Sequence, residues 1–319
     1  MSDTHNPPID DSAQQGSSSG DATSSAPETS EPTPPPAKPG MKKRWLYLIL
    51  AVMFLFVLMP YLIWQATWFG KPLNDKQMAD AFADTEHPRN AQHALSQVAD
   101  RMESPDPMVR ATAKPWYPQA IAAASSSESA LRSTAAWVMG KDPSVSEFHD
   151  ELKKLLVDSD PMVQRNAALS LVRFGDVSGH DMIVSMLKPW LQTAPVEGKL
   201  STRLTPGETV NVGTLIGRIE TPGGKVEIRT KMPGTIDQWI VKDGTPVTVN
   251  QPIAQLDPAA DVVLNALAAL YFIGHEDDIP AVAPYLRNIT GMPLSVSQQA
   301  KLTIDAIHTR MDMPPAVKP

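Results

Sequence analysis

The sequence predicts a multidomain α plus β fold, in which a disordered tail and one transmembrane helix precede an α-helical solenoid that a small all-β module interrupts. Three observations predict it: a long uncharged apolar run near the N-terminus, short helical patterns that recur, and a stretch between them in which Val, Ile and Thr alternate. We expect five segments: a disordered Pro/Ser-rich tail at 1–40, a transmembrane anchor at 41–70, helical repeats at 71–190, a β module at 191–258, and continued helical repeats at 259–319.

The composition excludes several classes of protein. The chain has 319 residues, no Cys and a net charge of −7. The absence of Cys excludes disulfides, thiolate metal sites and a cysteine nucleophile. A dedicated nucleic-acid-binding protein normally carries a basic stripe, so the acidic balance predicts no nucleic-acid partner.

Residues 1–40 have the composition of a disordered segment. They hold 8 Pro, 8 Ser, six acidic residues and one Lys. Such a segment cannot bury enough apolar surface to offset the entropy lost on ordering. We therefore expect a solvated tail.

The apolar run from Trp45 to Gly70 contains no formal charge and follows the basic triplet Lys42-Lys43-Arg44. About 20 apolar residues span the hydrocarbon core of a bilayer, whereas the apolar region of a cleaved signal peptide is about 7–15 residues long. We therefore expect an uncleaved anchor that contacts the lipid bilayer through residues 45–69. Aromatic residues at both ends suit interfacial belts: Trp45, Tyr47, Trp64 and Trp68.

The basic triplet also predicts the orientation of the chain. Positive charge flanks the cytoplasmic side of membrane helices, so the N-terminus should be cytoplasmic and residues 71–319 extracytoplasmic. The predicted location is a bacterial inner membrane, crossed once.

The helical repeats are clearest between Glu147 and Gly175. Two apolar stripes have helical spacing there, and Asp160 and Pro161 are suited to start the second helix, which Gly175 can end. The letters Asp-Pro-Met-Val at 160–163 occur also at 106–109, and Val262 to Gly274 repeats the small-residue helix that ends in Gly. These residues resemble HEAT repeats, including the HEAT-like units of the phycobilisome-lyase type. The resemblance implies a solenoid of helix pairs that acts mainly as a binding scaffold.

The β module reads as two similar halves. Gly207 and Gly244 are 37 residues apart, and so are Val210 and Val247. The second half, MPGTIDQWIVKDGTPVTVNQPIAQLDP, resembles the biotinyl/lipoyl domain and more closely the barrel-sandwich hybrid of periplasmic adaptor (membrane-fusion) proteins. The resemblance implies two layers of strands. The module interrupts a helix pair, so we expect it to project from one face of the solenoid.

A carrier domain of this kind would need a modified lysine at a hairpin tip. The resemblance implies a position eleven residues before the Gly that opens the second half, and counting back from Gly234 gives Gly223. We expect the tip at Gly223-Gly224, a good primed-turn pair, with Lys225 off-register by two positions. Lys225 is thus a weak candidate for modification, and we expect no cofactor.

The remaining polar and aromatic candidates have simple structural explanations. The cluster His275-Glu276-Asp277-Asp278 could hold a divalent ion, but Asp278 precedes Ile279-Pro280 and suits a helix cap, so we expect no metal. Asp158 and Asp160 have the same capping explanation. We expect four aromatic residues in the core or at interfaces: Trp116, Tyr117, Trp190 and Phe272. No catalytic residue is predicted.

The function expected from the sequence is that of a membrane-anchored extracytoplasmic scaffold or adaptor, which binds protein partners through its HEAT-like solenoid and an unmodified barrel-sandwich module. Two alternatives stay open. One is an accessory subunit of a membrane transport or secretion complex. The other is a biotinyl/lipoyl-type carrier that uses Lys225, or a lyase-like HEAT protein.

Overall fold

The computed structural model describes residues 43–66 and 72–312. The chain divides into two units between Gly70 and Lys71. The predicted tail, residues 1–40, lies outside the described residues.

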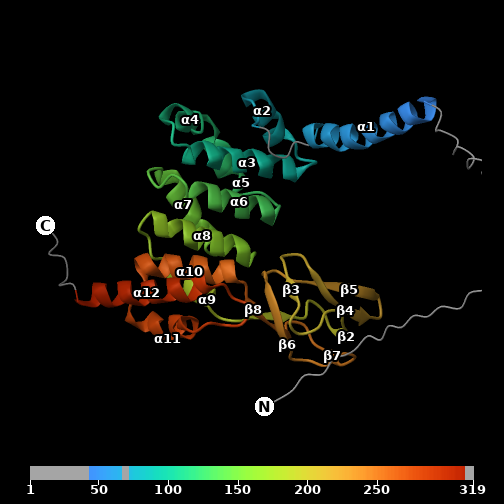
Figure 1. The fold of residues 1–319 in the computed structure, drawn as a ribbon. Helices are drawn as coiled ribbons and strands as arrows, with labels where there is room; N and C mark the ends of the chain where they lie inside the picture. Colours follow the sequence, from blue (N-terminus) through green and yellow to red (C-terminus); the bar gives the residue numbers. More distant parts are fainter. Residues whose placement is uncertain (1–42, 67–71, 313–319) are drawn as a thin grey trace, which may run out of the picture. The chain divides into compact units, whose positions relative to one another are not determined.

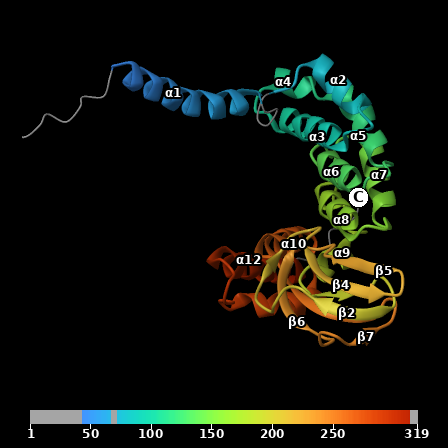
Figure 2. The same ribbon diagram turned by 90° about the vertical axis from the view of Figure 1, so that its right-hand side faces the viewer.

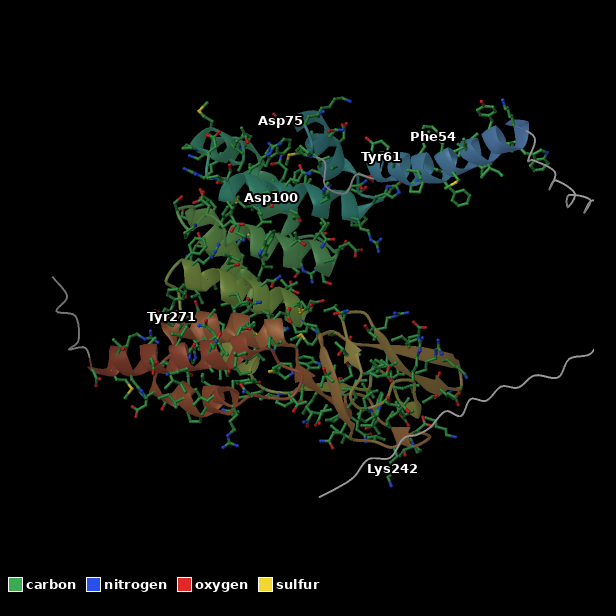
Figure 3. The ribbon with its side chains drawn as sticks, in the orientation of Figure 1. Phe54, Tyr61, Asp75, Asp100, Lys242 and Tyr271 are labelled. Carbon is green, nitrogen blue, oxygen red and sulfur yellow. The ribbon has the colours of Figure 1, made fainter. Side chains whose placement is uncertain are left out.

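The described part of the first unit is a single helix, α1 (Lys43–Ala66), with Pro60 inside it and exposed apolar side chains such as Phe54 (Figure 3). The predicted transmembrane helix is wrong, because no helix in the described part of the chain is both long and apolar enough to cross a membrane.

Three further predictions depended on that helix and are corrected with it: the single-pass inner-membrane location, the extracytoplasmic placement of residues 71–319, and the bilayer contact through residues 45–69. The side chains of Trp64 and Trp68, predicted for one interfacial belt, lie outside the described residues.

The second unit combines helices with two small sheets (Figure 1). Its helices before the strands are α2 (Asp75–Ala83), α3 (Pro88–Glu103), α4 (Pro107–Ala111), α5 (Tyr117–Ala123), α6 (Ser129–Met139), α7 (Ser146–Leu155), α8 (Pro161–Arg173) and α9 (His180–Ser185). Those after the strands are α10 (Ala260–Ile273), α11 (Ile279–Val282) and α12 (Leu294–Asp312). Short 3₁₀ turns are η1 (Lys114–Trp116), η2 (Glu276–Asp278) and η3 (Ala283–Leu286).

The helices α3, α6, α8, α10 and α12 form a series in which each packs against the next (Figures 1 and 2). Helices α5, α7 and α9 lie against α6, α8 and α10, respectively. One buried apolar cluster extends from Leu73 to Leu171, and a second joins Ala168 to residues of α9, α10 and α12. Helix α10 therefore continues the packing of α8, although about 90 residues separate them in the sequence.

The predicted start of α8 is confirmed. Asp160 Oδ1 accepts a hydrogen bond from the Met162 N–H at 2.8 Å, and Pro161 is the first helical residue. Asp106 caps α4 in the same way, with 2.8 Å to the Met108 N–H. Gly175 follows α8 with φ +71°, a left-handed conformation that favours glycine.

The strands are β1 (Trp190–Thr193), β2 (Gly198–Thr202), β3 (Thr209–Val210), β4 (Leu215–Thr221), β5 (Gly224–Arg229), β6 (Gly234–Trp239), β7 (Pro246–Val247) and β8 (Pro252–Pro258). They form two antiparallel four-stranded sheets, in the orders β1-β8-β6-β3 and β5-β4-β2-β7. Alternate residues of the strands face a shared core that includes Leu200, Ile219, Ile236 and Leu256.

The two halves of the β module exchange equivalent hydrogen bonds. The Gly207 N–H donates to the Ile236 carbonyl at 2.7 Å, and the Gly244 N–H donates to the Leu200 carbonyl at 2.8 Å. Both glycines have positive φ, +92° and +77°. Each half thus places a turn glycine against a strand of the other half, which explains the 37-residue spacing in the sequence.

The β4–β5 hairpin differs from its predicted form by one residue. Thr221 pairs with Gly224, so the two turn residues are Pro222 and Gly223, not Gly223 and Gly224. Gly224 has φ +125° and is the first residue of β5.

Candidate functional site

A pocket of about 640 Å³ opens on the face that α6, α8 and α10 share. Its lining combines apolar and polar side chains: Trp137 of α6 and Lys141 just after it, Leu169 and Arg173 on α8, and Asn265 and Phe272 on α10. The pocket therefore forms only where the three helices pack side by side.

Small residues allow α6 and α8 to pack closely beneath this pocket. Gly140 follows α6, and a Cβ atom there would lie 2.3 Å from Ser170 Oγ of α8. Ser170 Oγ in turn donates to the Ala136 carbonyl at 2.8 Å. Both Gly140 and Ser170 line the pocket, together with the larger side chain of Trp137.

Two aromatic residues of the pocket are open to solvent. Trp137 is 39% exposed and Phe272 68% exposed. Tyr271, also on α10 (Figure 3), packs edge-on against Phe272, with the two ring centroids 5.1 Å apart. The prediction that Phe272 belongs to the core is wrong, because α10 buries Leu267 and Leu270, and a residue two positions after Leu270 points away from that side of the helix.

The charged side chains of the pocket are linked by one acid. Lys141 Nζ lies 4.4 Å from the centre of the Trp137 ring and 2.7 Å from Glu103 Oε1. Arg173 Nη1 lies 3.9 Å from the same Glu103 oxygen and donates to the Gly140 carbonyl at 3.3 Å. A ligand with an apolar group and a carboxylate can thus meet Trp137 or Phe272 and compete with Glu103 for the two cations.

A second cluster brings together His180, His275 and Asp278. His180 Nε2 lies 2.9 Å, and His275 Nδ1 3.5 Å, from Asp278 Oδ2, whose side chain is 4% exposed. The two imidazole rings stack with their centres 4.4 Å apart. One ligand atom from each residue falls within 4.8 Å of the others, and two imidazoles with a carboxylate are donors that Zn²⁺ accepts.

The same Asp278 has a structural role that the sequence analysis only partly predicted. Its Oδ2 accepts from the His275 backbone N–H at 2.9 Å and so caps η2. Asp278 is the N-cap residue of α11, as predicted, but its side chain makes no capping hydrogen bond to that helix. His180 was missed altogether, since it lies about 95 residues before His275 and no short-range spacing connects them.

The other predicted residues lie apart from both clusters. Asp158 was predicted to cap a helix, but the N-cap of α8 is Asp160, and the carboxylate of Asp158 instead accepts two hydrogen bonds from Arg132. Trp116 is buried and stacks on Phe82, and the Tyr117 hydroxyl donates to Asp142 at 2.6 Å. Burial, followed by this contact with Asp142, raises the pKa of Tyr117.

Lys225 lies on β5, away from the turn residues of its hairpin. It faces Glu220 directly across the β4–β5 pair, and its Nζ is 2.9 Å from Glu220 Oε1. The side chain is mostly exposed. The amine of Lys225 therefore lies beside the hairpin, in an ion pair with Glu220, and not at its tip.

Comparison with known proteins gives little further information. No protein family matches the chain, and no curated protein matches it. Among solved structures, it is similar to a single-chain, multi-domain long-chain acyl-CoA carboxylase, at 13% sequence identity and a TM-score of 0.22. That similarity covers 40% of this chain and 14% of the carboxylase.

Proposed function

We propose that this protein is a scaffold that binds a segment of a partner protein in the pocket on α6, α8 and α10. The observation that carries the proposal is the exposure of Trp137 and Phe272 beside two cations. Aromatic residues and Arg are the side chains that most often anchor protein interfaces. A partner segment with an apolar side chain next to an Asp or Glu fits this combination.

We further propose that the helices are HEAT-like repeats. Equivalent contacts between successive helices support this. Ser170 Oγ of α8 donates to the Ala136 carbonyl of α6 at 2.8 Å, and Thr303 Oγ1 of α12 donates to the Leu267 carbonyl of α10 at 2.8 Å. In a stack built this way each helix pair buries its apolar side against its neighbours and leaves one long face for a partner.

The β module is proposed to be an unmodified barrel-sandwich module that serves as a second docking surface. The hydrogen bonds exchanged between its halves and the ion pair of Lys225 with Glu220 support this assignment. A swinging-arm carrier needs its amine at the tip of the hairpin, where Pro222 and Gly223 lie in this chain.

The experiment is photo-crosslinking of the full chain in cells, with a benzophenone amino acid in place of Phe272. We expect a specific adduct with one partner protein, and we expect Trp137→Ala to remove it by deleting the neighbouring anchor. The same probe in place of Met108, an exposed residue of α4 outside the pocket and the β module, is the matched control. The same adducts from both positions, or none from position 272, would contradict the proposal.

A second variant tests the predicted chemistry of the partner. Glu103→Gln releases Lys141 and Arg173 from their shared carboxylate, so an acidic partner segment should bind more tightly and the adduct yield should rise. A lower yield would show that the partner is not acidic at this point.

A further inference from the structure

A second cavity, of about 590 Å³, lies where α8 and α9 meet the β module. Its walls come from four stretches of the chain: 159–165 at the start of α8, 182–193 from α9 through β1, 231–233 before β6, and 258–262 at the start of α10. The cavity is separate from the pocket of the proposed scaffold, with which it shares no lining residue.

The guanidinium of Arg165, on α8, is buried in the wall of this cavity without a compensating charge. The residue is 3% exposed, and its Nη1 lies 3.5 Å from Met162 Sδ and 3.7 Å from Met232 Sδ. Within residues 43–66 and 72–312, no carboxylate lies at ion-pair distance from it, and no oxygen accepts a hydrogen bond from it. Buried charges in proteins are normally paired, because thioether sulfur is a poor acceptor and desolvation of a cation is costly.

Two more polar atoms of the cavity are buried without a partner among the described residues. These are the indole Nε1 of Trp190, which is a hydrogen-bond donor, and Gln192 Oε1. Lys188 and Lys231 also line the cavity, and none of its described lining residues is acidic. An arginine fork, an indole N–H and two lysines form a set of donors for an anionic oxygen.

The charge around Arg165 favours a singly charged anion. Burial lowers the pKa of Arg165 to about 10, and the carboxylate of Asp261, on α10 outside the lining, opposes this shift. Arg165, Lys188 and Lys231 supply three positive charges, and Asp261 supplies one negative charge nearby. This balance suits a ligand with a carboxylate better than one with a doubly charged phosphate. The apolar part of the wall includes Met182, Met186 and Val262.

We propose that the cavity between α8, α9 and β1 binds an amphiphilic carboxylate, with its head group on Arg165 and Trp190 Nε1 and its apolar body against the methionines. Such a ligand contacts both α8 and β1, so its binding holds the β module against the helices. The cavity volume lies in the range of small-molecule sites.

The test is calorimetric titration of the full chain with octanoate, and with 1-octanol and inorganic phosphate as controls for the tail and the charge. We expect octanoate to bind at one site and both controls to bind at least tenfold more weakly. Equal binding of octanol, tighter binding of phosphate, or no binding of octanoate at millimolar concentration would each overturn the proposal.

Two variants locate the site. Arg165→Met should weaken octanoate binding at least tenfold, while it raises the melting temperature of the ligand-free protein by removing an uncompensated buried charge. A purely structural Arg165 would instead make the variant less stable and leave octanoate affinity unchanged, which would overturn the proposal. Trp190→Phe keeps an aromatic ring, removes one donor, and should weaken binding severalfold. Arg203→Met, at an exposed arginine of the β module, is the control and should change neither quantity.

Discussion

Arg132 of α6 and Asp158, which lies two residues before the N-cap of α8, form a bidentate ion pair. Arg132 Nε and Nη2 donate to the two carboxylate oxygens at 2.7 and 2.8 Å. The side chains are 14% and 9% exposed. Asp158 Oδ1 also accepts from the Asp160 N–H at 2.8 Å, so one carboxylate joins the helix α6 to the cap of α8.

The Arg132–Asp158 pair predicts a stability difference that depends on pH. The hydrogen bond from Arg132 is the main cause that lowers the pKa of Asp158 below its usual 3.8. Asp158→Asn should lower the free energy of unfolding by about 2 kcal/mol at pH 7, since it leaves Arg132 without its partner. A carboxyl group whose pKa is lower in the folded than in the unfolded protein stabilises the fold at pH values above its unfolded-state pKa. That stabilisation is lost as the pH falls through its folded-state pKa.

Urea unfolding of wild type and variant between pH 3 and pH 8 measures this effect. We expect a constant difference down to about pH 4 and a smaller one below it. Asp150→Asn, at a mostly exposed aspartate of α7, is the control and should have little effect. A difference that does not change with pH would mean that packing, and not charge, is responsible.

The contact of Gly140 with Ser170 predicts a steric limit at the α6–α8 interface. Gly140→Ala would place a Cβ atom 2.3 Å from Ser170 Oγ and 2.6 Å from Ser170 Cβ, so α6 and α8 must move apart. We expect a loss of about 1–3 kcal/mol in the free energy of unfolding. Gly223→Ala is the matched control, because the nearest atom to its Cβ would be Thr221 Oγ1 at 3.8 Å. Equal effects of the two substitutions would refute the proposed close packing.

The cluster of His180, His275 and Asp278 is predicted to stabilise the fold by linking α9 to η2 through hydrogen bonds. His180→Phe keeps a ring next to His275 but removes the donor to buried Asp278, and should cost about 1–2 kcal/mol in thermal unfolding. His308→Phe, at an exposed histidine of α12, should cost little. We expect EDTA to leave the melting temperature of the purified protein unchanged, whereas a metal centre would make it fall.

Lys225 is predicted to stay unmodified. Mass spectrometry of the protein purified from its own cells should detect no biotinyl or lipoyl addition. Peptide mapping of residues 218–229 then locates any addition that is found. A biotinyl or lipoyl addition on Lys225 would make the chain a carrier and remove the basis for a docking role of the β module.

Local structure could be predicted from the sequence wherever neighbouring residues decide it. Asp160 and Pro161 start α8 as expected, because a capping carboxylate and a fixed φ act within one turn of helix. The 37-residue spacing of Gly207 and Gly244 correctly marked two equivalent turns. The resemblances to HEAT repeats and to biotinyl/lipoyl domains stay predictions.

Other features could not be predicted because they depend on how distant segments meet. Phe272 was expected in the core because it is apolar, but the side of α10 that packs against α8 and α12 excludes it. The membrane-spanning prediction relied on the length of the uncharged run, its flanking basic residues and its aromatic ends, and no described helix is both long and apolar enough to cross a membrane.

The sequence by itself determined where helices start, where strands alternate and where glycines turn the chain, since those preferences involve residues a few positions apart. Only the tertiary structure decided which side chains share a site. His180 meets Asp278, and Arg165 meets Met232, because residues of the β module and of η2 fold back onto α8 and α9. Free energy gained by burying apolar surface brings such segments together, and it leaves no local pattern in the sequence to reveal which polar groups will meet.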